Sequence, residues 1–350
     1  MSPLRIAMVA PVAQAVPPAR SGSIETVTAL LTDGLVARGH HVTLFATRTS
    51  TTTATLASTL ERGYHDDTSL WPWELCELFN LAAAAERADD FDVIHYQAEY
   101  VPIALAFSRL TPTPVLQTVH HAPSAEEVRL WSRYPDAPFV AVSSAQARLL
   151  TGLRVAATIH HAVDPARLTF QSTPDDYLVF LGRFTPGKGV LEAIEVATRT
   201  GRRLLLAAAE NDYYRESVAS HVDGHQVVYV GEVDQAAKAA LLGRARALIY
   251  PVQQAESFGL VLTEAMTCGT PVAALDQGAV SELVDNGVTG QVSSSLDALI
   301  ATLPAVEALD RRAVRTHAVA RFGPDRMVDA HVAVYTRLAT QASAPPPCPA

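Results

Sequence analysis

Residues 247–275 constrain the fold of this chain more than any other stretch. Residues 247–250 are an apolar run of strand length that a proline ends, and residues 271–275 are a second such run. Between them, residues 259–268 carry apolar side chains at helical spacing, and the segment closes on Gly269. A strand, a loop, a helix and a second strand in direct succession predict an α/β fold.

Two carboxylates in this stretch suggest a polar ligand. Glu256 lies in the loop, and Glu264 lies about two turns into the helix. The unpaired backbone N–H groups at the helix start, at Phe258, Gly259 and Leu260, form a site for an anion or a hydroxyl. Carboxylates suit vicinal hydroxyls because each oxygen can accept a charge-assisted hydrogen bond. On spacing alone, solvated glutamates at a helix start explain the pair equally well.

Composition limits the possible partners. A chain of 350 residues, 49% of them apolar, is long enough for two domains. The net charge of −9 leaves no basic field for nucleic acid, so any phosphate must be bound locally. Cys76, Cys268 and Cys348 show neither metal-ligand spacing nor an even disulfide framework. No apolar run approaches the length of a membrane span. We therefore expect a cytoplasmic protein.

A second loop supplies the local positive charge. The apolar run 177–181 predicts a strand, and Gly182-Arg183-Phe-Thr-Pro-Gly-Lys188-Gly189 follows at once. The guanidinium of Arg183 can bind two oxygens, and Lys188 adds a point charge. The loop predicts a clamp for an anionic leaving group.

Together these motifs resemble a known family. The run from Glu256 to Glu264, followed by Gly-Thr-Pro-Val, resembles the E-x7-E signature of the retaining glycosyltransferases of family 4. Gly182, Arg183, Lys188 and Gly189 match that family's Gly-Arg-x4-Lys-Gly pattern. The resemblance implies the GT-B fold, in which two Rossmann-like domains face each other across a cleft. It implies an acceptor-side domain at 1–165, a nucleotide-sugar domain at 170–322 and a helix at 325–340 that crosses back to the first domain. Residues 342–350 are Pro-rich and lack periodicity, which predicts a loose tail.

The resemblance also implies roles for individual residues. Glu256 would contact the transferred sugar, and Glu264 would hold the ribose of a nucleotide-sugar donor, with a UDP-sugar expected. Arg183 and Lys188 would bind the diphosphate, so no metal is expected. Further donor contacts are implied for Gly22, Ser23, Gly231, Val233, Ser257, Phe258, Gly259 and Leu260.

The first domain carries weaker versions of the family motifs. Gly22-Ser23-Ile24-Glu25 resembles Gly-Gly-x-Glu, with serine in place of the second glycine. His120 follows the expected strand at 114–119, and the resemblance places it, rather than His121, against the donor sugar. His161-Ala-Val-Asp164 resembles the turn Asn-Gly-Val-Asp.

Acceptor-side candidates follow from strand ends, where open α/β sheets bind ligands. His95 lies in the expected strand at 92–96, and Glu99 and Tyr100 follow it. Trp71 and Trp73 either line an acceptor pocket or pack on the next helix. Asp90-Phe-Asp92 spells a metal-binding motif of another glycosyltransferase architecture, but it precedes a strand, so we assign it to the solvated edge.

These features predict a retaining glycosyltransferase that uses a nucleoside diphosphate sugar and a small-molecule acceptor of natural-product assembly. We expect neither nucleic-acid binding nor membrane insertion. A phosphorylase or a nucleotide-sugar epimerase on the same fold, and a non-catalytic nucleotide-sugar-binding protein, stay open. A dehydrogenase is disfavoured because the G-x-G-x-x-G fingerprint is missing.

Overall fold

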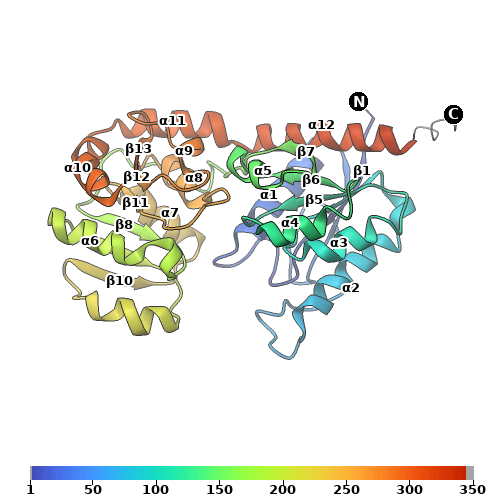
Figure 1. The fold of residues 1–350 in the computed structure, drawn as a ribbon, viewed down its shortest axis with the longest axis horizontal. Helices are drawn as coiled ribbons and strands as arrows, with labels where there is room; N and C mark the ends of the chain where they lie inside the picture. Colours follow the sequence, from blue (N-terminus) through green and yellow to red (C-terminus); the bar gives the residue numbers. More distant parts are fainter. Residues whose placement is uncertain (1, 344–350) are drawn as a thin grey trace. The chain divides into compact units, whose positions relative to one another are not determined.

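A computed structural model describes residues 2–343, which form two compact α/β units (Figure 1). Of the described residues, unit 1 contains 2–18, 22–161 and 324–343, and unit 2 contains 19–21 and 162–323. Each unit is built around its own parallel sheet, so the predicted fold of two Rossmann-like domains is confirmed. Residues 162–165, which the sequence analysis places in the first domain, group with the second.

Unit 1 has a seven-stranded parallel sheet with the order β3-β2-β1-β4-β5-β6-β7. Its strands are Arg5–Val9 (β1), His41–Phe45 (β2), Thr55–Ala57 (β3), Val93–Tyr96 (β4), Val115–Val119 (β5), Pro138–Ala141 (β6) and Arg154–Thr158 (β7). Its helices are Ser23–Ala37 (α1), Trp73–Ala85 (α2), Ala88–Asp90 (η1), Val101–Phe107 (α3), Ala125–Trp131 (α4), Ser144–Leu149 (α5) and Pro324–Ser343 (α12).

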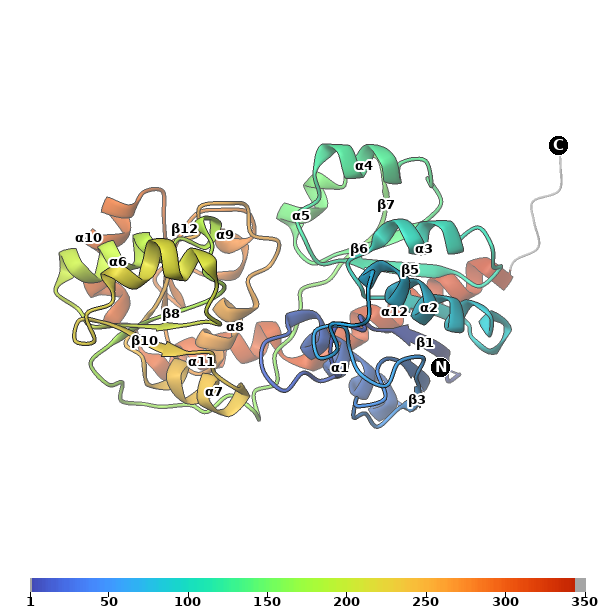
Figure 2. The ribbon, with the colours of Figure 1, turned by 90° about the horizontal axis from the view of Figure 1, so that it is seen from below.

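Alternation along the strands divides the core of unit 1 into two layers. Ala7, Val9 and Ile94 pack beneath α2 and α3. The intervening side chains of the same strands, among them Met8 and His95, face the other side, where α1 and α12 lie against each other (Figure 2). Both faces of the central strands are therefore buried, as parallel sheets require.

The closing helix α12 is longer than the predicted 325–340. It begins at Pro324, directly after Gly323, and it runs to Ser343. Ala342 and Ser343, predicted to begin a loose tail, are therefore helical. The remainder of that predicted tail, residues 344–350, lies outside the described residues.

Unit 2 has a six-stranded parallel sheet with the order β10-β9-β8-β11-β12-β13. Its strands are Leu178–Leu181 (β8), Leu204–Ala207 (β9), Val227–Gly231 (β10), Leu248–Tyr250 (β11), Val272–Leu275 (β12) and Gly290–Ser293 (β13). Its helices are Pro186–Lys188 (η2), Val190–Thr200 (α6), Tyr214–Val218 (η3), Ala219–His221 (η4), Gln235–Arg244 (α7), Leu260–Thr267 (α8), Val280–Leu283 (α9), Leu296–Glu307 (α10) and Arg311–Phe322 (α11).

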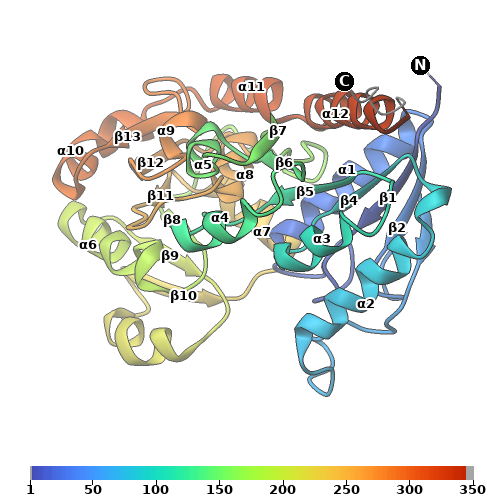
Figure 3. The same ribbon diagram turned by 45° about the vertical axis from the view of Figure 1, so that its right-hand side comes forward.

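Helices cover both faces of this second sheet. On one face, α6 and α10 lie side by side (Figure 3). Their apolar residues pack together over the central strands. On the other face, α8 packs against the sheet and is itself contacted by α7 and α11. The α8 helix therefore lies between the sheet and two other helices, which explains why six of its eight residues are buried.

Each strand order places a topological switch point beside the first strand of its sheet. In unit 1 the order reverses at β1 and β4, and in unit 2 it reverses at β8 and β11. Ligands of open α/β sheets bind at the carboxyl ends of strands at such points. The expected ligand-binding loops are therefore those that follow β1 and β4 in unit 1 and β8 and β11 in unit 2.

Candidate functional site

Lys188 and Glu256 meet at the switch point of unit 2. The ammonium of Lys188 lies 2.5 Å from Oε2 of Glu256, and the hydroxyl of Tyr250 donates to the same oxygen. Only 18% of the Lys188 side chain and 13% of the Glu256 side chain are exposed. Burial, and then the charge of Glu256, raise the pKa of Tyr250, so the phenol stays a neutral donor. The result is a half-buried ion pair from two loops that are far apart in the sequence.

Glycines bring these two loops together. The amide of Gln253 donates to the carbonyl of Gly187 at 2.9 Å. Gly189 has a φ of +75°, and a Cβ there would lie 2.0 Å from the carbonyl oxygen of Pro251. Because only glycine tolerates both conditions, the loop after β8 can lie directly on the segment after β11. This close approach places the ammonium of Lys188 at Glu256.

The backbone of Glu256 is held from the opposite direction by Gly278 and Ala279. The amide of Ala279 donates to the Glu256 carbonyl at 2.9 Å, and a Cβ on Gly278 would lie 2.3 Å from that same oxygen. The position of the first glutamate of the motif therefore depends on a glycine after β12. The local spacing of the motif gave no indication of this dependence.

Glu264 forms the second ion pair of the site. Its Oε1 lies 2.5 Å from the ammonium of Lys238 on α7. The side chains are 8% and 14% exposed, respectively. Oε2 of Glu264 makes no hydrogen bond to another described residue, and it is not completely buried. One carboxylate oxygen is thus held by Lys238, and the other remains available to a ligand hydroxyl.

Neither Lys238 nor Tyr250 was predicted from the sequence. Among the 27 basic residues Lys and Arg of the chain, only Lys188 and Lys238 are lysines. Each of these two lysines pairs with one of the two glutamates of the motif. The scarcity of lysine was therefore a usable signal, whereas the position of Tyr250, at the end of a buried strand, was not.

The other predicted donor-side residues lie around these pairs. Arg183 is exposed and has no ion pair with a described carboxylate. Gly259 caps α8 with a φ of +88°, and Leu260 is the first residue of that helix. Ser257 and Phe258 are buried, with the Phe258 ring against Phe322.

The predicted base-side turn lies at the end of β10. Gly231 has a φ of +82°, and its carbonyl accepts the amide of Ala208 at 3.2 Å. Val233 is half-buried in the turn that follows.

In unit 1, the loop after β1 enters α1 through Gly22. A Cβ at Gly22 would lie 2.5 Å from Nε2 of Gln14 and 2.8 Å from Oε2 of Glu25, so a side chain at this position would displace the ends of those two side chains. Ser23, the first residue of α1, is exposed and therefore accommodates its hydroxymethyl group. Burial raises the pKa of Glu25, which is 5% exposed.

His95 does not lie where the sequence analysis placed it. It is fully buried between β4 and α12, with Nδ1 2.6 Å from the Tyr335 hydroxyl and Nε2 2.8 Å from the Thr118 hydroxyl. The physical reason is the pleat, which turns alternate residues of β4 toward α12 instead of the end of the sheet. An acceptor cannot reach His95 in this structure.

His120 lies at the carboxyl end of β5 and is half-buried. Its two ring nitrogens contact Gln97 and His161. His121, the alternative that the sequence analysis set aside, pairs instead with Glu127 of α4 at 3.0 Å.

The aromatic acceptor-side candidates divide into two groups. The rings of Trp73 and Tyr100 meet edge to face at 5.6 Å, and Trp73 also contacts Tyr64. Trp71 is 76% exposed. Glu99, between β4 and α3, is exposed. Trp73, Tyr100 and Glu99 thus remain candidates at the edge where unit 1 has its switch point.

Glu77 is a buried acid that the sequence analysis did not select. It lies on α2, accepts the Val12 amide at 3.0 Å and the Tyr64 hydroxyl at 3.3 Å, and is 1% exposed. Burial raises its pKa to about 8, so it is largely protonated at neutral pH.

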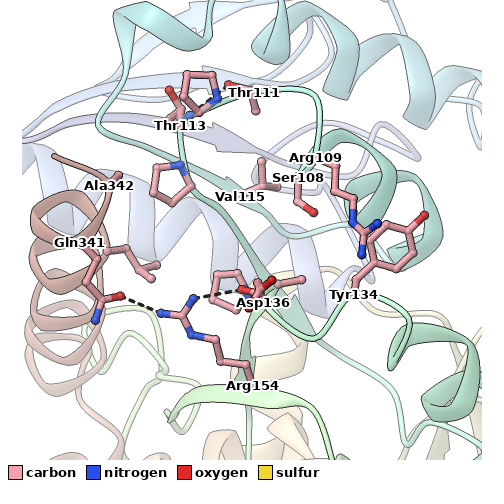
Figure 4. Close-up of a pocket in the computed structure, with 15 residues that line it drawn as sticks. Ser108, Arg109, Thr111, Thr113, Val115, Tyr134, Asp136, Arg154, Gln341 and Ala342 are labelled. Carbon is pink, nitrogen blue, oxygen red and sulfur yellow. Dashed lines mark hydrogen bonds between the residues drawn. The ribbon is translucent and has the colours of Figure 1, made fainter. Parts of the chain in front are cut away.

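A pocket of about 360 Å³ opens elsewhere in unit 1 (Figure 4). It lies at the amino ends of β5, β6 and β7, the edge opposite to the switch-point loops. Arg154 spans it from the carbonyl of Asp136 to the side chain of Gln341 (Figure 4). None of the predicted site residues lines this pocket.

No helix within 2–343 combines the length and the apolarity that a bilayer span needs. Within the same range, no three His, Cys, Asp or Glu side chains gather as metal ligands.

Comparisons with known proteins agree with this fold. The model of "Glycosyltransferase Family 4" matches residues 24–167, and the model of "Glycosyl transferases group 1" matches residues 168–309. AviGT4, a glycosyltransferase involved in avilamycin A biosynthesis, has a solved structure with a TM-score of 0.74 and 27% identity, over 97% of this chain and 99% of that one.

Curated relatives match over shorter regions. The phosphatidyl-myo-inositol mannosyltransferase of Propionibacterium freudenreichii is 30% identical over 257 residues, which are 66% of this chain and 66% of that protein. The glycogen synthase of Mycobacterium tuberculosis is 33% identical over 150 residues, which are 40% of this chain and only 36% of the synthase.

Two parallel-sheet α/β units, together with the likeness of the chain to AviGT4, show the GT-B fold of glycosyltransferases. The two family models follow each other along residues 24–309 and cover most of the chain. The chain therefore belongs to the family 4 glycosyltransferases.

Proposed function

We propose that this protein transfers a sugar from a nucleoside diphosphate sugar to a small-molecule acceptor, with retention at the anomeric carbon. A UDP-sugar is the expected donor. One observation carries the proposal: both lysines of the chain pair with the two glutamates of the E-x7-E motif at a switch point of the sheet. Such an arrangement supplies positive charge for a diphosphate and carboxylate oxygens for hydroxyls within one unit.

The chemistry of the leaving group follows from these residues. As the bond to the sugar breaks, negative charge develops on the β-phosphate and positive charge develops on the anomeric carbon. Arg183 is free of carboxylate partners among residues 2–343, and Lys188 has three N–H donors, of which Glu256 and Tyr250 occupy two. These two cations would stabilise the departing diphosphate without a metal.

Retention would follow if the acceptor attacks from the face that the diphosphate leaves. In that mechanism the leaving phosphate takes the acceptor proton, and Glu256 and His120 position the sugar without forming a covalent adduct. Glu264 would accept hydrogen bonds from the ribose through its open Oε2, because Lys238 already holds Oε1.

The acceptor belongs to unit 1 in this proposal. The aromatic pair Trp73 and Tyr100 and the exposed carboxylate Glu99 lie beside the switch-point loops of that unit. A related solved enzyme acts in avilamycin A biosynthesis, which supports a small-molecule acceptor of natural-product assembly. Relatives named for phosphatidyl-myo-inositol make a lipid acceptor the alternative to exclude.

A thermal-shift panel of nucleotides and nucleotide sugars tests the donor, because a ligand that binds the folded state stabilises it by mass action. UDP-sugars should raise Tm in a concentration-dependent way, and donors with other bases form the comparison set. Incubation with the stabilising donor alone then separates slow hydrolysis from epimerisation or phosphate-dependent cleavage. A flat panel across all bases would contradict the proposed donor class.

A further inference from the structure

His120 has no ring nitrogen left for a ligand. Its Nε2 lies 2.9 Å from Oε1 of Gln97, and its Nδ1 lies 3.3 Å from Nε2 of His161. The rings of His120 and His161 are also stacked, with centroids 5.1 Å apart and an interplanar angle of 20°. Both hydrogen-bonding positions of the imidazole are therefore occupied by the protein itself.

These contacts determine the tautomer of His120. An amide oxygen can only accept, so the contact with Gln97 requires a proton on Nε2 of His120. In a neutral imidazole the other nitrogen, Nδ1, then carries the lone pair. His161 must donate to it through its own Nε2. The two histidines are thus fixed as a donor–acceptor pair.

Gln97 is itself held in place. It is 1% exposed, and its amide nitrogen lies 3.2 Å from both ring nitrogens of His95. His95 is fixed in turn by the Tyr335 hydroxyl of α12 and the Thr118 hydroxyl of β5. A continuous chain of polar contacts therefore runs from α12 through β4 to His120.

Burial keeps the whole network uncharged. It lowers the pKa of His120 to about 3, with smaller contributions from His121 and His331, and it lowers the pKa of His161 well below its usual value. A second proton on Nδ1 of His120 would face the N–H that His161 donates, and it would remove the hydrogen bond between the two rings. The donor–acceptor pair is stable because both rings are neutral at physiological pH.

We propose that Gln97 and His161 are positioning residues, which fix His120 as its Nε2–H tautomer and in a single ring orientation. This inference rests on the proposed function insofar as it places His120 beside the donor. The tautomer itself is a property of the free protein.

The first experiment is therefore independent of activity. Two-bond ¹⁵N–¹H correlation spectra of the full chain, with the His120 signals assigned from His120→Gln, report which ring nitrogen carries the proton. The expected result is the Nε2–H form, unchanged from pH 8 to pH 5. An Nδ1–H form, an average of the two forms, or titration within that range would overturn the inference.

Variants of the two partners test the consequence for transfer. Gln97→Met removes the acceptor, and His161→Phe keeps the stacked ring but removes the donor. Each should lower kcat by about 10- to 100-fold with little change in KM, the cost expected when a reacting partner is misplaced by roughly 1 Å. Gln97→Glu keeps an acceptor oxygen at the same position, so it should retain more activity and add a new titration to the pH–rate profile.

Gln117→Met is the matched control. Gln117 is a fully buried glutamine of β5 whose side-chain nitrogen and oxygen have no partner among the described residues. Its replacement removes no side-chain hydrogen bond to another described residue, so kcat and the His120 tautomer should stay at wild-type values. Equal losses in Gln117→Met and Gln97→Met would indicate a general packing effect and contradict a positioning role.

The two hypotheses fail in different ways. Absence of transfer by the wild type with every nucleotide sugar would contradict the proposed function and leave the tautomer result intact. An active wild type whose Gln97→Met variant keeps full kcat would contradict the positioning role alone.

Discussion

The two units solve the problem of buried polarity in opposite ways. Both lysines of the chain lie in unit 2, where each forms a short ion pair with a glutamate. Unit 1 contains no lysine and places neutral imidazoles and amides at the corresponding position of its sheet. Half-buried charge in unit 2 suits a dianionic diphosphate, whereas neutral contacts in unit 1 fix geometry without attracting ions.

The difference separates two roles: the charged side chains of unit 2 can bind an anion, and the neutral side chains of unit 1 hold a fixed geometry. An ammonium that already contacts a carboxylate can shift toward a phosphate with little change in its surroundings. A neutral imidazole with both nitrogens occupied has no such freedom, and its contribution lies in shape. Removal of a charge in unit 2 should therefore have larger effects than any neutral change in unit 1.

The largest effect is expected for Lys188→Met. If Lys188 stabilises the departing diphosphate as proposed, loss of its ammonium should lower kcat with the donor sugar by about 10²- to 10³-fold. Lys188→Arg restores the charge with a different geometry and should recover only part of the rate. Steady-state kinetics measure both. A wild-type kcat in Lys188→Met would contradict the catalytic role of the charge in unit 2.

A smaller effect is expected at the second ion pair. If Glu264 accepts from the ribose, Glu264→Gln should weaken nucleotide binding by roughly 10- to 100-fold, the loss of about 1.5–3 kcal/mol for a hydrogen bond to a charged group. The variant should also lose the preference for UDP over 2′-deoxy-UDP or 3′-deoxy-UDP. Calorimetric titration of the three nucleotides measures this.

Lys238→Met provides the control for that result. This variant leaves Glu264 without its partner at Oε1. Because the two side chains contact each other, their effects on nucleotide binding should couple. The double variant Lys238→Met/Glu264→Gln should therefore lose no more binding free energy than the two single variants lose together. Equal affinity of Glu264→Gln and the wild type for all three nucleotides would contradict the proposed contact between Glu264 and the ribose.

The smallest effect concerns acid stability of unit 1. Burial lowers the pKa of His331 to about 4, whereas an unfolded histidine titrates near 6.5. A lowered pKa means that the stability is fully present above about 6.5 and is lost as pH falls toward 4. Between pH 7 and pH 5 the wild type should therefore lose roughly 2 kcal/mol more than His331→Phe.

Tryptophan fluorescence during urea unfolding measures this selectively, because Trp71, Trp73 and Trp131 all lie in unit 1. His41→Phe is the control, since His41 is exposed on β2. The raised pKa of Glu77 acts in the opposite sense in this range, but it is common to all three proteins and cancels from the comparison. Equal losses of unfolding free energy in the wild type and His331→Phe would show that protonation of His331 does not contribute to the acid sensitivity of unit 1.

Local sequence patterns predicted much of the charged site. Glu256, Glu264, Arg183 and Lys188 lie in loops and helix starts whose glycines and prolines mark them without any knowledge of the fold. Their pairing was not predictable. Lys238 comes 26 residues before Glu264, and its distance from Glu264 depends on how α7 packs against α8.

His95 is a residue whose position was wrongly predicted from the local sequence. Its position at a strand end suggested an acceptor site, but α12, which carries its partner Tyr335 240 residues later, covers that face of the sheet. The pattern of β4 is apolar or aromatic at almost every position, so it does not reveal which face each side chain occupies. Only the docking of a distant helix settled that choice.

The sequence by itself determined the α/β class, the two sheets, the family and the loops that carry charge, because these depend on periodicity and turn residues over short spans. The tertiary structure alone decided which lysine holds which glutamate, that His95 is sealed in the core and that both nitrogens of His120 are occupied. Such contacts join residues that are far apart along the chain, and their geometry exists only after helices and sheets have packed.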